Sequence, residues 1–262
     1  MKIITYSDLH LEFKHGWALP ADVDADLMIL AGDIISFANY KPLSNLLKDW
    51  NKPVLYVAGN HEYYTQNPMD RENGDFRAWL SENLPHVVCL QDEGITIDGV
   101  HFFGGTMWTN FANENPVAMV DARRNMNDFR LIRTPEGEVF TPEYSVKLHR
   151  VFVEKLMAWF QEGRGGPHVV ISHHSPIINP NTQYRNSPLQ PAFNSLDMVE
   201  IIEEYQPNLW VYGHTHECDD QTFGDTRIIS NQLGYPNRSG GYECRNFDEN
   251  GKAVVVSAQK SV

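Results

Sequence analysis

Five short apolar runs in this chain each end in aspartate, asparagine or histidine, and this repeated ending constrains the fold more than any other feature. The runs are KIITYSDLH (2–10), LMILAGDI (27–34), VLYVAGNHE (54–62), HVVISHHSP (168–176) and NLWVYGHTHE (208–217). A turn or a packed histidine would account for any one ending taken alone. Ligands in open α/β sheets bind beyond the carboxyl ends of the strands, so five such endings predict a shared binding site at one edge.

The apolar runs alternate with segments of helical periodicity, which indicates an α/β fold. Strands of this group are expected near 2–6, 27–31, 53–58, 168–172 and 208–212, and helices near 40–50, 75–83, 143–162 and 194–204. Further strands, with hairpin turns such as Asp98-Gly99 and Asn250-Gly251, are expected near 87–90, 94–97, 100–104, 227–230, 242–247 and 253–257. Strands buried on both faces read as near-continuous apolar runs. We therefore expect a four-layer α/β/β/α sandwich of two mixed β-sheets flanked by helices.

No internal repeat, low-complexity tract or long linker divides the sequence, so residues 1–262 are predicted to form a single domain. With 42% hydrophobic residues, a chain of this length can bury a sizeable core. Residues 105–141 and 175–193 look irregular and are expected to be loops, which at this length are usually functional or disordered.

Composition excludes several kinds of protein. A net charge of −13 argues against a surface that binds nucleic-acid polymers, which normally requires clustered lysine and arginine. The three cysteines, Cys89, Cys218 and Cys244, form no Cys-x-x-Cys pair, so neither a disulfide framework nor a thiolate zinc site is expected. No run has the length of a signal peptide core or a membrane span, so we expect a cytoplasmic protein without a membrane partner.

The polar residues at the strand ends are typical metal ligands. All are oxygen or imidazole donors, which suit zinc, manganese, iron and related divalent ions. In an extended chain, residues i and i+2 point the same way, so Asp8 with His10 and His214 with His216 can each chelate from one side of a strand end. The candidate donors are Asp8, His10, Asp33, Asn60, His61, His173, His174, His214 and His216.

These motifs resemble those of the calcineurin-like metallophosphoesterase superfamily. Its Asp-x-His, Gly-Asp, Gly-Asn-His-Glu, strand-end His and Gly-His-x-His motifs occur here in the same order. They are Asp8-Leu9-His10, Gly32-Asp33, Gly59-Asn60-His61-Glu62, His173 and Gly213-His214-Thr215-His216. The phrases GGTMWTNF, MNDFRLIR, HHSP, QPAFNS and SNQLGYP are more weakly similar to a bacterial branch of uncharacterised phosphoesterases.

The resemblance implies the same sandwich fold and two divalent metal ions (Mn, Fe, Zn or similar) bridged by the carboxylate of Asp33. One ion would be held by Asp8, His10, Asp33 and His216, and the other by Asp33, Asn60, His173 and His214. Strand alternation allows only one of His173 and His174 to face the metals, and the family pattern favours the first. His174 would then pack against the site, hold a ligand in place or contact substrate.

The resemblance also implies a phosphoesterase that hydrolyses a small phosphomonoester or phosphodiester. Four positive charges on the metals exceed the two negative charges of Asp8 and Asp33, so a phosphate would be attracted. A water shared by the metals would become the hydroxide that attacks in line. Asn60 would bind metal through a neutral oxygen, which preserves this positive charge. His61, left free of metal, could protonate the leaving alkoxide, and Glu62 could orient a neighbouring imidazole.

Tyr184 and Arg185 follow the HHSP phrase and are predicted substrate contacts, because aromatic and guanidinium groups recognise nucleobases and phosphates. A surface turn would explain the same pair. Two alternatives to the phosphoesterase remain open. One is a nuclease of the same superfamily, which the acidic balance disfavours; the other is a non-catalytic protein-binding scaffold, which would normally show broken ligand motifs.

Overall fold

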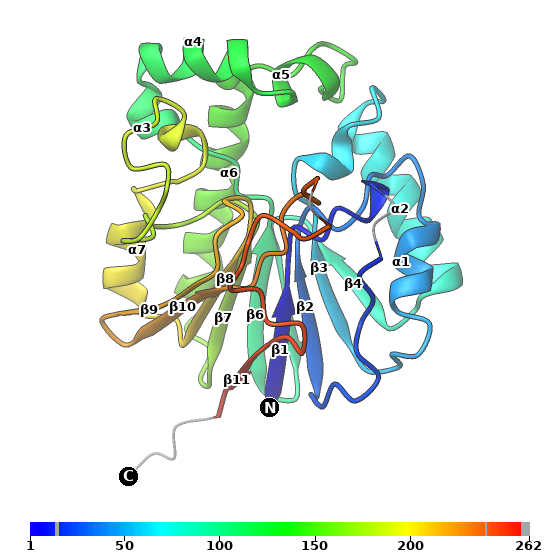
Figure 1. Cartoon of the computed structure of the whole chain (residues 1–262). Coiled ribbons are helices and arrows are strands. Elements are labelled where there is room, and N and C mark those ends of the chain that lie inside the picture. The colour runs from blue at the N-terminus through cyan, green and yellow to red at the C-terminus, as the bar shows by residue number, and fades with distance from the viewer. Residues whose placement is uncertain (14–15, 239, 258–262) are drawn as a thin grey trace.

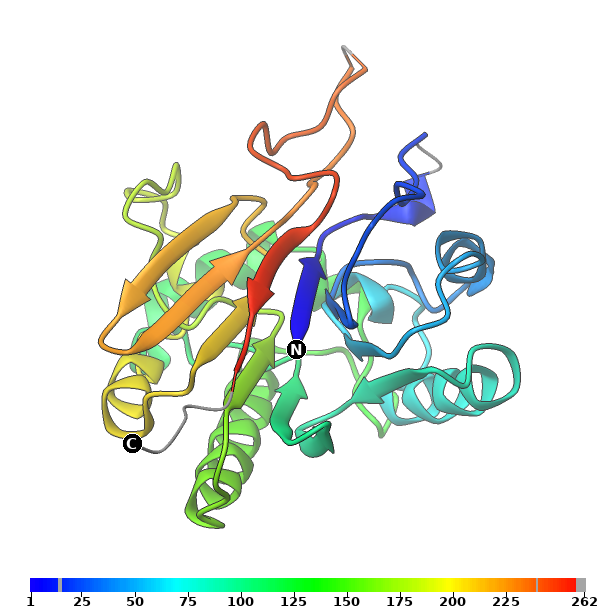
Figure 2. The same ribbon diagram turned by 90° about the horizontal axis from the view of Figure 1, so that it is seen from below.

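The computed structural model describes residues 1–13, 16–238 and 240–257, and in it two β-sheets lie between helices (Figure 1). The first sheet has the order β11-β1-β2-β3-β4, made of β11 (Lys252–Val255), β1 (Lys2–Tyr6), β2 (Leu27–Ala31), β3 (Val54–Val57) and β4 (Val87–Leu90). Strands β1 to β4 are parallel, and β11 pairs antiparallel with β1, next to which it lies in Figure 2.

The second sheet is also mixed. Its order is β5-β6-β7-β8-β10-β9, made of β5 (Glu93–Ile97), β6 (Val100–Gly105), β7 (His168–Ser172), β8 (Leu209–Tyr212), β10 (Thr226–Ser230) and β9 (Asp219–Phe223). The outer strands β5 and β9 are antiparallel to their neighbours, and the four central strands are parallel. The prediction of two mixed sheets flanked by helices is therefore confirmed.

In the part of the chain that the structure describes, some helices cover the outer faces of the sheets and others lie above the second sheet (Figure 1). The covering helices are α1 (Lys41–Leu46), α2 (Met69–Asn83), α6 (Pro142–Gln161) and α7 (Met198–Tyr205), and those above the second sheet are α3 (Phe111–Glu114), α4 (Pro116–Asn125) and α5 (Asp128–Leu131). Single 3₁₀ turns follow β1, follow β3 and precede α7, at Leu11–Phe13, His61–Tyr63 and Gln190–Ala192.

Three apolar clusters separate the four layers. Between the sheets, Ile29 and Leu55 pack with Phe102 and Val211. The other face of the first sheet packs on α1 and α2, and that of the second packs on α6 and α7. Since side chains alternate along each strand, burial on both faces explains why these strands are apolar throughout.

The segments that deliver the motifs were predicted to within a residue or two, whereas three other expectations were wrong. Residues 242–247 are not a strand, because the carboxylate of Glu243 accepts from the backbone N–H of Tyr235 and draws this segment toward the strand ends. Strand β9 was missed because its DDQTF sequence has low strand propensity; Arg227 on β10 binds both oxygens of Asp220 and holds it in place. Residues 105–141 contain three helices rather than one loop.

The turn and thiol expectations have mixed outcomes. Asp98-Gly99 joins β5 to β6 as a hairpin, but Asn250-Gly251 precedes β11 and joins no hairpin.

Cys218 and Cys244 are 26 residues apart in sequence, yet their Sγ atoms lie 2.9 Å apart as free thiols. Among the described residues, no helix combines the length and apolar character needed to cross a bilayer.

The strand register brings the motif-bearing ends together. In the first sheet Tyr6 pairs with Leu30 and Ala31 with Val57, so β1, β2 and β3 end side by side. The second sheet joins this edge where Nδ1 of His173 donates to the carbonyl of Ala31, at 3.0 Å. Polar side chains from both sheets therefore meet at the carboxyl ends of the parallel strands.

Candidate metal centre

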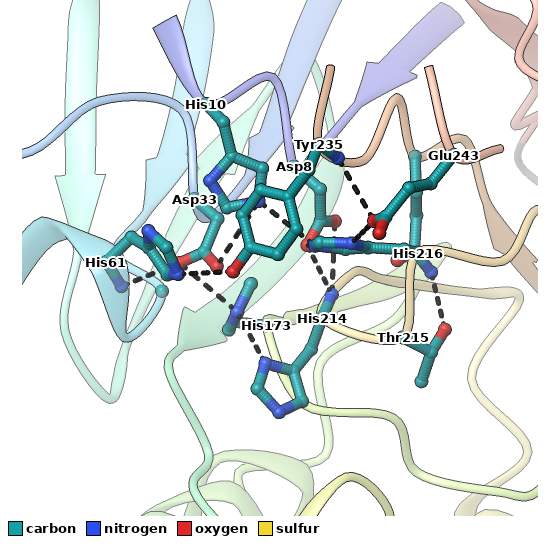
Figure 3. Close-up of polar contacts among 12 residues, drawn as sticks. Asp8, His10, Asp33, His61, His173, His214, Thr215, His216, Tyr235 and Glu243 are labelled. Atoms are coloured by element: carbon teal, nitrogen blue, oxygen red, sulfur yellow. Dashed lines mark hydrogen bonds and ion pairs between the residues drawn. The ribbon is translucent and has the colours of Figure 1, made fainter. Parts of the chain in front are cut away.

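The candidate ligands follow strands β1, β2, β3, β7 and β8, and those labelled in Figure 3 point toward one another. Five of them have left-handed backbone, with φ between +45° and +73°. Each residue held in this backbone conformation costs about 1–3 kcal/mol of folding free energy, and it persists only where the surrounding structure fixes it. They are Asp8, His10, Asp33, His214 and His216. The left-handed backbone at these strand ends therefore directs the five side chains into one shared space.

Glycine is required at positions 59 and 213 because side chains of other motifs approach the backbone closely there. A Cβ at Gly59 would lie 2.1 Å from Oδ1 of Asp33, and one at Gly213 would lie 2.7 Å from Oδ2 of Asp8. Backbone groups beside these glycines also hold the carboxylates. The N–H of His61 donates to Asp33 at 2.8 Å, and that of His214 donates to Asp8 at 2.9 Å.

The first donor cluster contains Asp8, His10 and His216, whose donor atoms all lie within 4.8 Å of one another. Nδ1 of His10 donates to Glu12 at 3.2 Å, and Nδ1 of His216 donates to Glu243. These bonds leave the two Nε2 atoms facing each other at 3.0 Å. Two imidazole lone pairs repel at this distance, so the pair requires either a proton on one ring or a cation beside both.

The second donor cluster contains Asp33, His173 and His214 and meets the same 4.8 Å limit. Since Nδ1 of His173 donates to a backbone carbonyl, its Nε2 is left to face Oδ1 of Asn60 at 3.1 Å and Nδ1 of His214 at 3.1 Å. The side chain of Asp33 is nearby, with Oδ1 at 3.4 Å from Nε2 of His173. This cluster again gathers acceptor atoms that need a positive charge among them.

Asp33 lies between the two clusters. Its Oδ1 faces His173, whereas its Oδ2 faces Nε2 of His10 at 3.9 Å. Burial opposes ionisation of this carboxyl group, but the rings of His173 and His61 outweigh burial and hold its pKa well below the usual value. Burial also opposes the charged form of His173, but the charge of Asp33 outweighs burial and raises the pKa of His173 to about 10. A metal ion at that nitrogen would therefore have to displace a proton.

His61 shares the carboxylate of Glu12 with His10 and also contacts Tyr235. Its Nδ1 donates to Glu12 at 3.0 Å, and its Nε2 lies 2.8 Å from the hydroxyl of Tyr235. Burial lowers its pKa, but the carboxylates of Asp33 and Glu12 outweigh burial and raise it to about 9. The ring is therefore disposed to carry a proton beside the two clusters.

The remaining predicted site residues lie in different surroundings. His174 points away from the donors: its Nδ1 faces the carbonyl of Thr106 at 3.2 Å, and its ring packs on His214. Burial, followed by the charge of His173, lowers its pKa to about 3, so it is a neutral packing residue here. Tyr184 lines the pocket described below. Arg185 is exposed and donates to the carbonyl of Pro180.

Glu62 is fully buried and joins the Gly-Asp segment after β2 to its own segment after β3. Its carboxylate accepts from the hydroxyl of Tyr56 and from the backbone N–H groups of Gly59, Asp33 and Ile34, at distances between 2.5 and 2.9 Å. Burial and the carboxylate of Asp33 raise its pKa to about 7. Its predicted role of orienting an imidazole does not match these contacts, because every partner named here is a backbone N–H or a tyrosine hydroxyl.

A pocket of about 250 Å³ opens onto both clusters. Among the described residues that line it there is no lysine or arginine, so any positive charge of its side chains is on histidine. The lining consists of Asp33, Asn60, His61, Tyr64, Asn125, Met126, Asn127, Asp128, Tyr184, Leu189, Phe193, His214, His216, Tyr235 and Glu243. Because carboxylates line the same space, a cation at the donor clusters would favour binding of an anionic ligand.

Comparison with known proteins accounts for this arrangement. A family model described as calcineurin-like phosphoesterase matches residues 1–218. The chain belongs to this family. A curated relative of this phosphoesterase, an uncharacterised protein of Acanthamoeba polyphaga mimivirus, is 27% identical over 271 residues, covering 90% of this chain and 92% of the relative.

Solved structures share the fold of the phosphoesterase. The phosphopantetheinyl hydrolase of Mycobacterium tuberculosis superposes with a TM-score of 0.73 and 19% identity, covering 100% of this chain and 98% of that one. A dimetal phosphatase from Danio rerio gives a TM-score of 0.50 and 12% identity, covering 88% and 86% of the two chains. At these sequence identities, the similarity to both structures shows a shared fold and nothing more.

Sequence reasoning missed four residues that orient the phosphoesterase's candidate ligands. Glu12 binds two histidines, and Glu243 and Tyr235 bind one each. Asp128 accepts from Nδ2 of Asn60 at 2.9 Å, which turns Oδ1 of that amide toward the second cluster. Only Asp128 and Tyr235 fell within phrases noted for their family resemblance, MNDFRLIR and SNQLGYP, and neither phrase identifies a partner.

We predict that Glu62→Gln will lower the free energy of unfolding of the metal-free phosphoesterase by about 2–4 kcal/mol, because the amide nitrogen would face N–H donors instead of accepting from them. Denaturant titration followed by circular dichroism measures this loss. The exposed control Glu162→Gln should change stability by less than about 0.5 kcal/mol. Equal stability of the two variants would show that Glu62 does not hold the motif segments.

Proposed function

We propose that this protein is a dinuclear-metal-dependent phosphoesterase that hydrolyses a small phosphomonoester or phosphodiester. One observation carries the proposal: the two oxygens of Asp33 face different donor clusters, so one carboxylate is placed to bridge two ions. The donor set supports it as well, because nitrogen and oxygen ligands suit zinc, manganese and iron. The shared fold with a dimetal phosphatase agrees with a two-metal site.

The two ligand sets follow from the clusters. Asp8, His10 and His216 would hold one ion, and Asn60, His173 and His214 the other, with Asp33 common to both. When bound, the ions would stabilise charge on the phosphoryl oxygens and lower the pKa of a shared water that attacks in line with the leaving oxygen. They would also add positive charge to a pocket lined by the carboxylates of Asp33, Asp128 and Glu243.

His61 would act as the general acid. Its Nδ1 is held by Glu12, which directs Nε2 toward the pocket and toward the hydroxyl of Tyr235. A substrate oxygen that replaces this hydroxyl would accept the proton as its bond to phosphorus breaks. The proposal leaves His61 out of the ligand sets, although donor atoms of His10, Asp33 and His61 also lie within 4.8 Å of one another.

A substrate panel tests the proposal. Purified protein loaded with manganese, zinc or iron would be given bis-p-nitrophenyl phosphate, p-nitrophenyl phosphate, cyclic nucleotides and phospholipid head groups. We expect metal-dependent hydrolysis of at least one small ester. Absence of both bound metal and hydrolysis would favour the protein-binding scaffold. Salt-sensitive DNA binding would favour the nuclease, for which the acidic pocket offers no support.

We predict that Asp33→Ala will remove both metals and all measurable activity, because one carboxylate neutralises two ions. Elemental analysis of the purified variant measures the metal content, and Asp75→Ala, an exposed aspartate on α2, is the matched control. Two metals per chain in Asp33→Ala would contradict the bridged site.

We predict that Asp128→Ala will lower the affinity for the ion held by Asn60 by about 10–100-fold and leave the affinity for the other ion unchanged. Loss of this carboxylate frees the Asn60 amide to rotate its oxygen away from the second cluster. Titration calorimetry with Mn²⁺ should show one weakened and one unchanged site. Uniform weakening of both sites, or none, would contradict this orienting role.

We predict that His61→Ala will keep its metals and slow alkyl phosphoesters far more than p-nitrophenyl esters, whose leaving group departs without a proton. General acid catalysis typically contributes about 10²–10⁴-fold. Measuring kcat for both ester classes in wild type and variant decides the role. Equal losses would show that His61 positions phosphate instead, and loss of a metal would make it a ligand.

A further inference from the structure

A second cavity adjoins the metal pocket and differs from it in chemistry. It has a volume of about 600 Å³ and shares His61, Tyr64, Asn127 and Tyr235 with the smaller pocket. Its remaining walls are mainly apolar, formed by Phe13, Leu131 and Pro236. We call this cavity the side groove. Its size lies in the range of cavities that bind small organic molecules.

The side groove is suited to an uncharged group. Of the described residues that line it, none is lysine or arginine, and Glu12 is the one that carries a full negative charge. Phe13 is 49% exposed, with its ring edge-on to Tyr235 at a centroid distance of 5.6 Å. A large aromatic side chain left this exposed at the entrance offers a flat apolar wall. The side chains of Phe13, Leu131 and Pro236 offer no hydrogen-bond donor, so an anionic occupant would lose hydration against them.

The position of His61 relates the groove to the reaction. His61 lines both cavities, and its Nε2 faces the hydroxyl of Tyr235, which also lines both. An oxygen that takes a proton from this nitrogen must lie at the wall between them. The phosphoryl group lies on the metal side of that oxygen, so the carbon skeleton of the leaving alcohol extends to the other side.

We propose that the side groove binds the leaving alcohol of the substrate, and that this alcohol is an uncharged, largely apolar or aromatic group. The inference rests on the proposed function, because it needs a phosphoester at the donor clusters and a proton from His61. It excludes leaving groups that carry phosphate or carboxylate, since these would lose hydration against Phe13 and Leu131.

The first test uses methyl 4-nitrophenyl phosphate and the same diester with a carboxylate on the aryl ring, hydrolysed by the metal-loaded protein. We expect kcat/KM to favour the ester with the uncharged aryl ring about tenfold or more. Leu131→Arg should reduce that preference at least tenfold. The control Leu196→Arg changes a 45% exposed leucine outside both cavities and should keep the preference within about twofold.

The second test measures binding without turnover. Titration calorimetry of metal-free protein with 4-methylumbelliferone, a neutral aromatic alcohol, should show binding that weakens about tenfold in Leu131→Arg and in Phe13→Ser but not in Leu196→Arg. Phe13 is on the surface, so Phe13→Ser keeps the test valid if Leu131→Arg fails to fold.

The outcomes separate this inference from the proposed function. Metal-dependent hydrolysis with equal ester preference in Leu131→Arg and Leu196→Arg would overturn the groove assignment and leave the proposed function standing. If no ester is hydrolysed although 4-methylumbelliferone binding still depends on Leu131 and Phe13, the proposed function fails. The leaving-group role then fails with it, and only a groove for aromatic alcohols is left.

Discussion

The carboxylate of Asp33 is the contact on which the rest of the site depends. It lies where the two sheets meet, and its oxygens face donors from β1 on one side and from β7 on the other. Around it, imidazole and amide acceptors approach one another as closely as 3.0 Å. Such crowding of lone pairs needs positive charge among them, which protons or bound cations can supply.

This crowding needs a rigid support, and the motifs provide it for one another. Glu62 is buried beneath the site and accepts from backbone groups of two strand ends, which fixes the strained turn at Asp33. Gly59 and Gly213 lack the Cβ that would collide with the carboxylates. The Gly-Asp, Gly-Asn-His-Glu and Gly-His-x-His motifs therefore describe contacts between strand ends as much as individual ligands.

The sequence predicts the sandwich and the residues that meet at its edge, because both depend on local patterns. Parallel strands buried on both faces are apolar throughout, and a polar residue that ends such a run must lie at the sheet edge. The orienting residues could not be predicted in this way. Glu243 lies on an irregular segment, 242–247, that was predicted to be a strand. Tyr235 lies where no element was predicted, and Asp128 lies on a short helix within a predicted loop. Their roles arise from contacts between distant segments, which no local periodicity encodes.

Ligands and cavity walls come from different parts of the fold, and this separation has a consequence for specificity. The candidate ligands follow strands, whose positions are fixed by two packed sheets. The apolar walls of the side groove come instead from the turn at Phe13, the end of α5 at Leu131 and the loop at Pro236. Loops tolerate substitution better than buried strand ends do. If the side groove binds the leaving alcohol as proposed, changes in these three segments would alter which alcohol the site accepts while the donor clusters keep their geometry. The shared family motifs would then identify the reaction class, and the groove would determine the substrate.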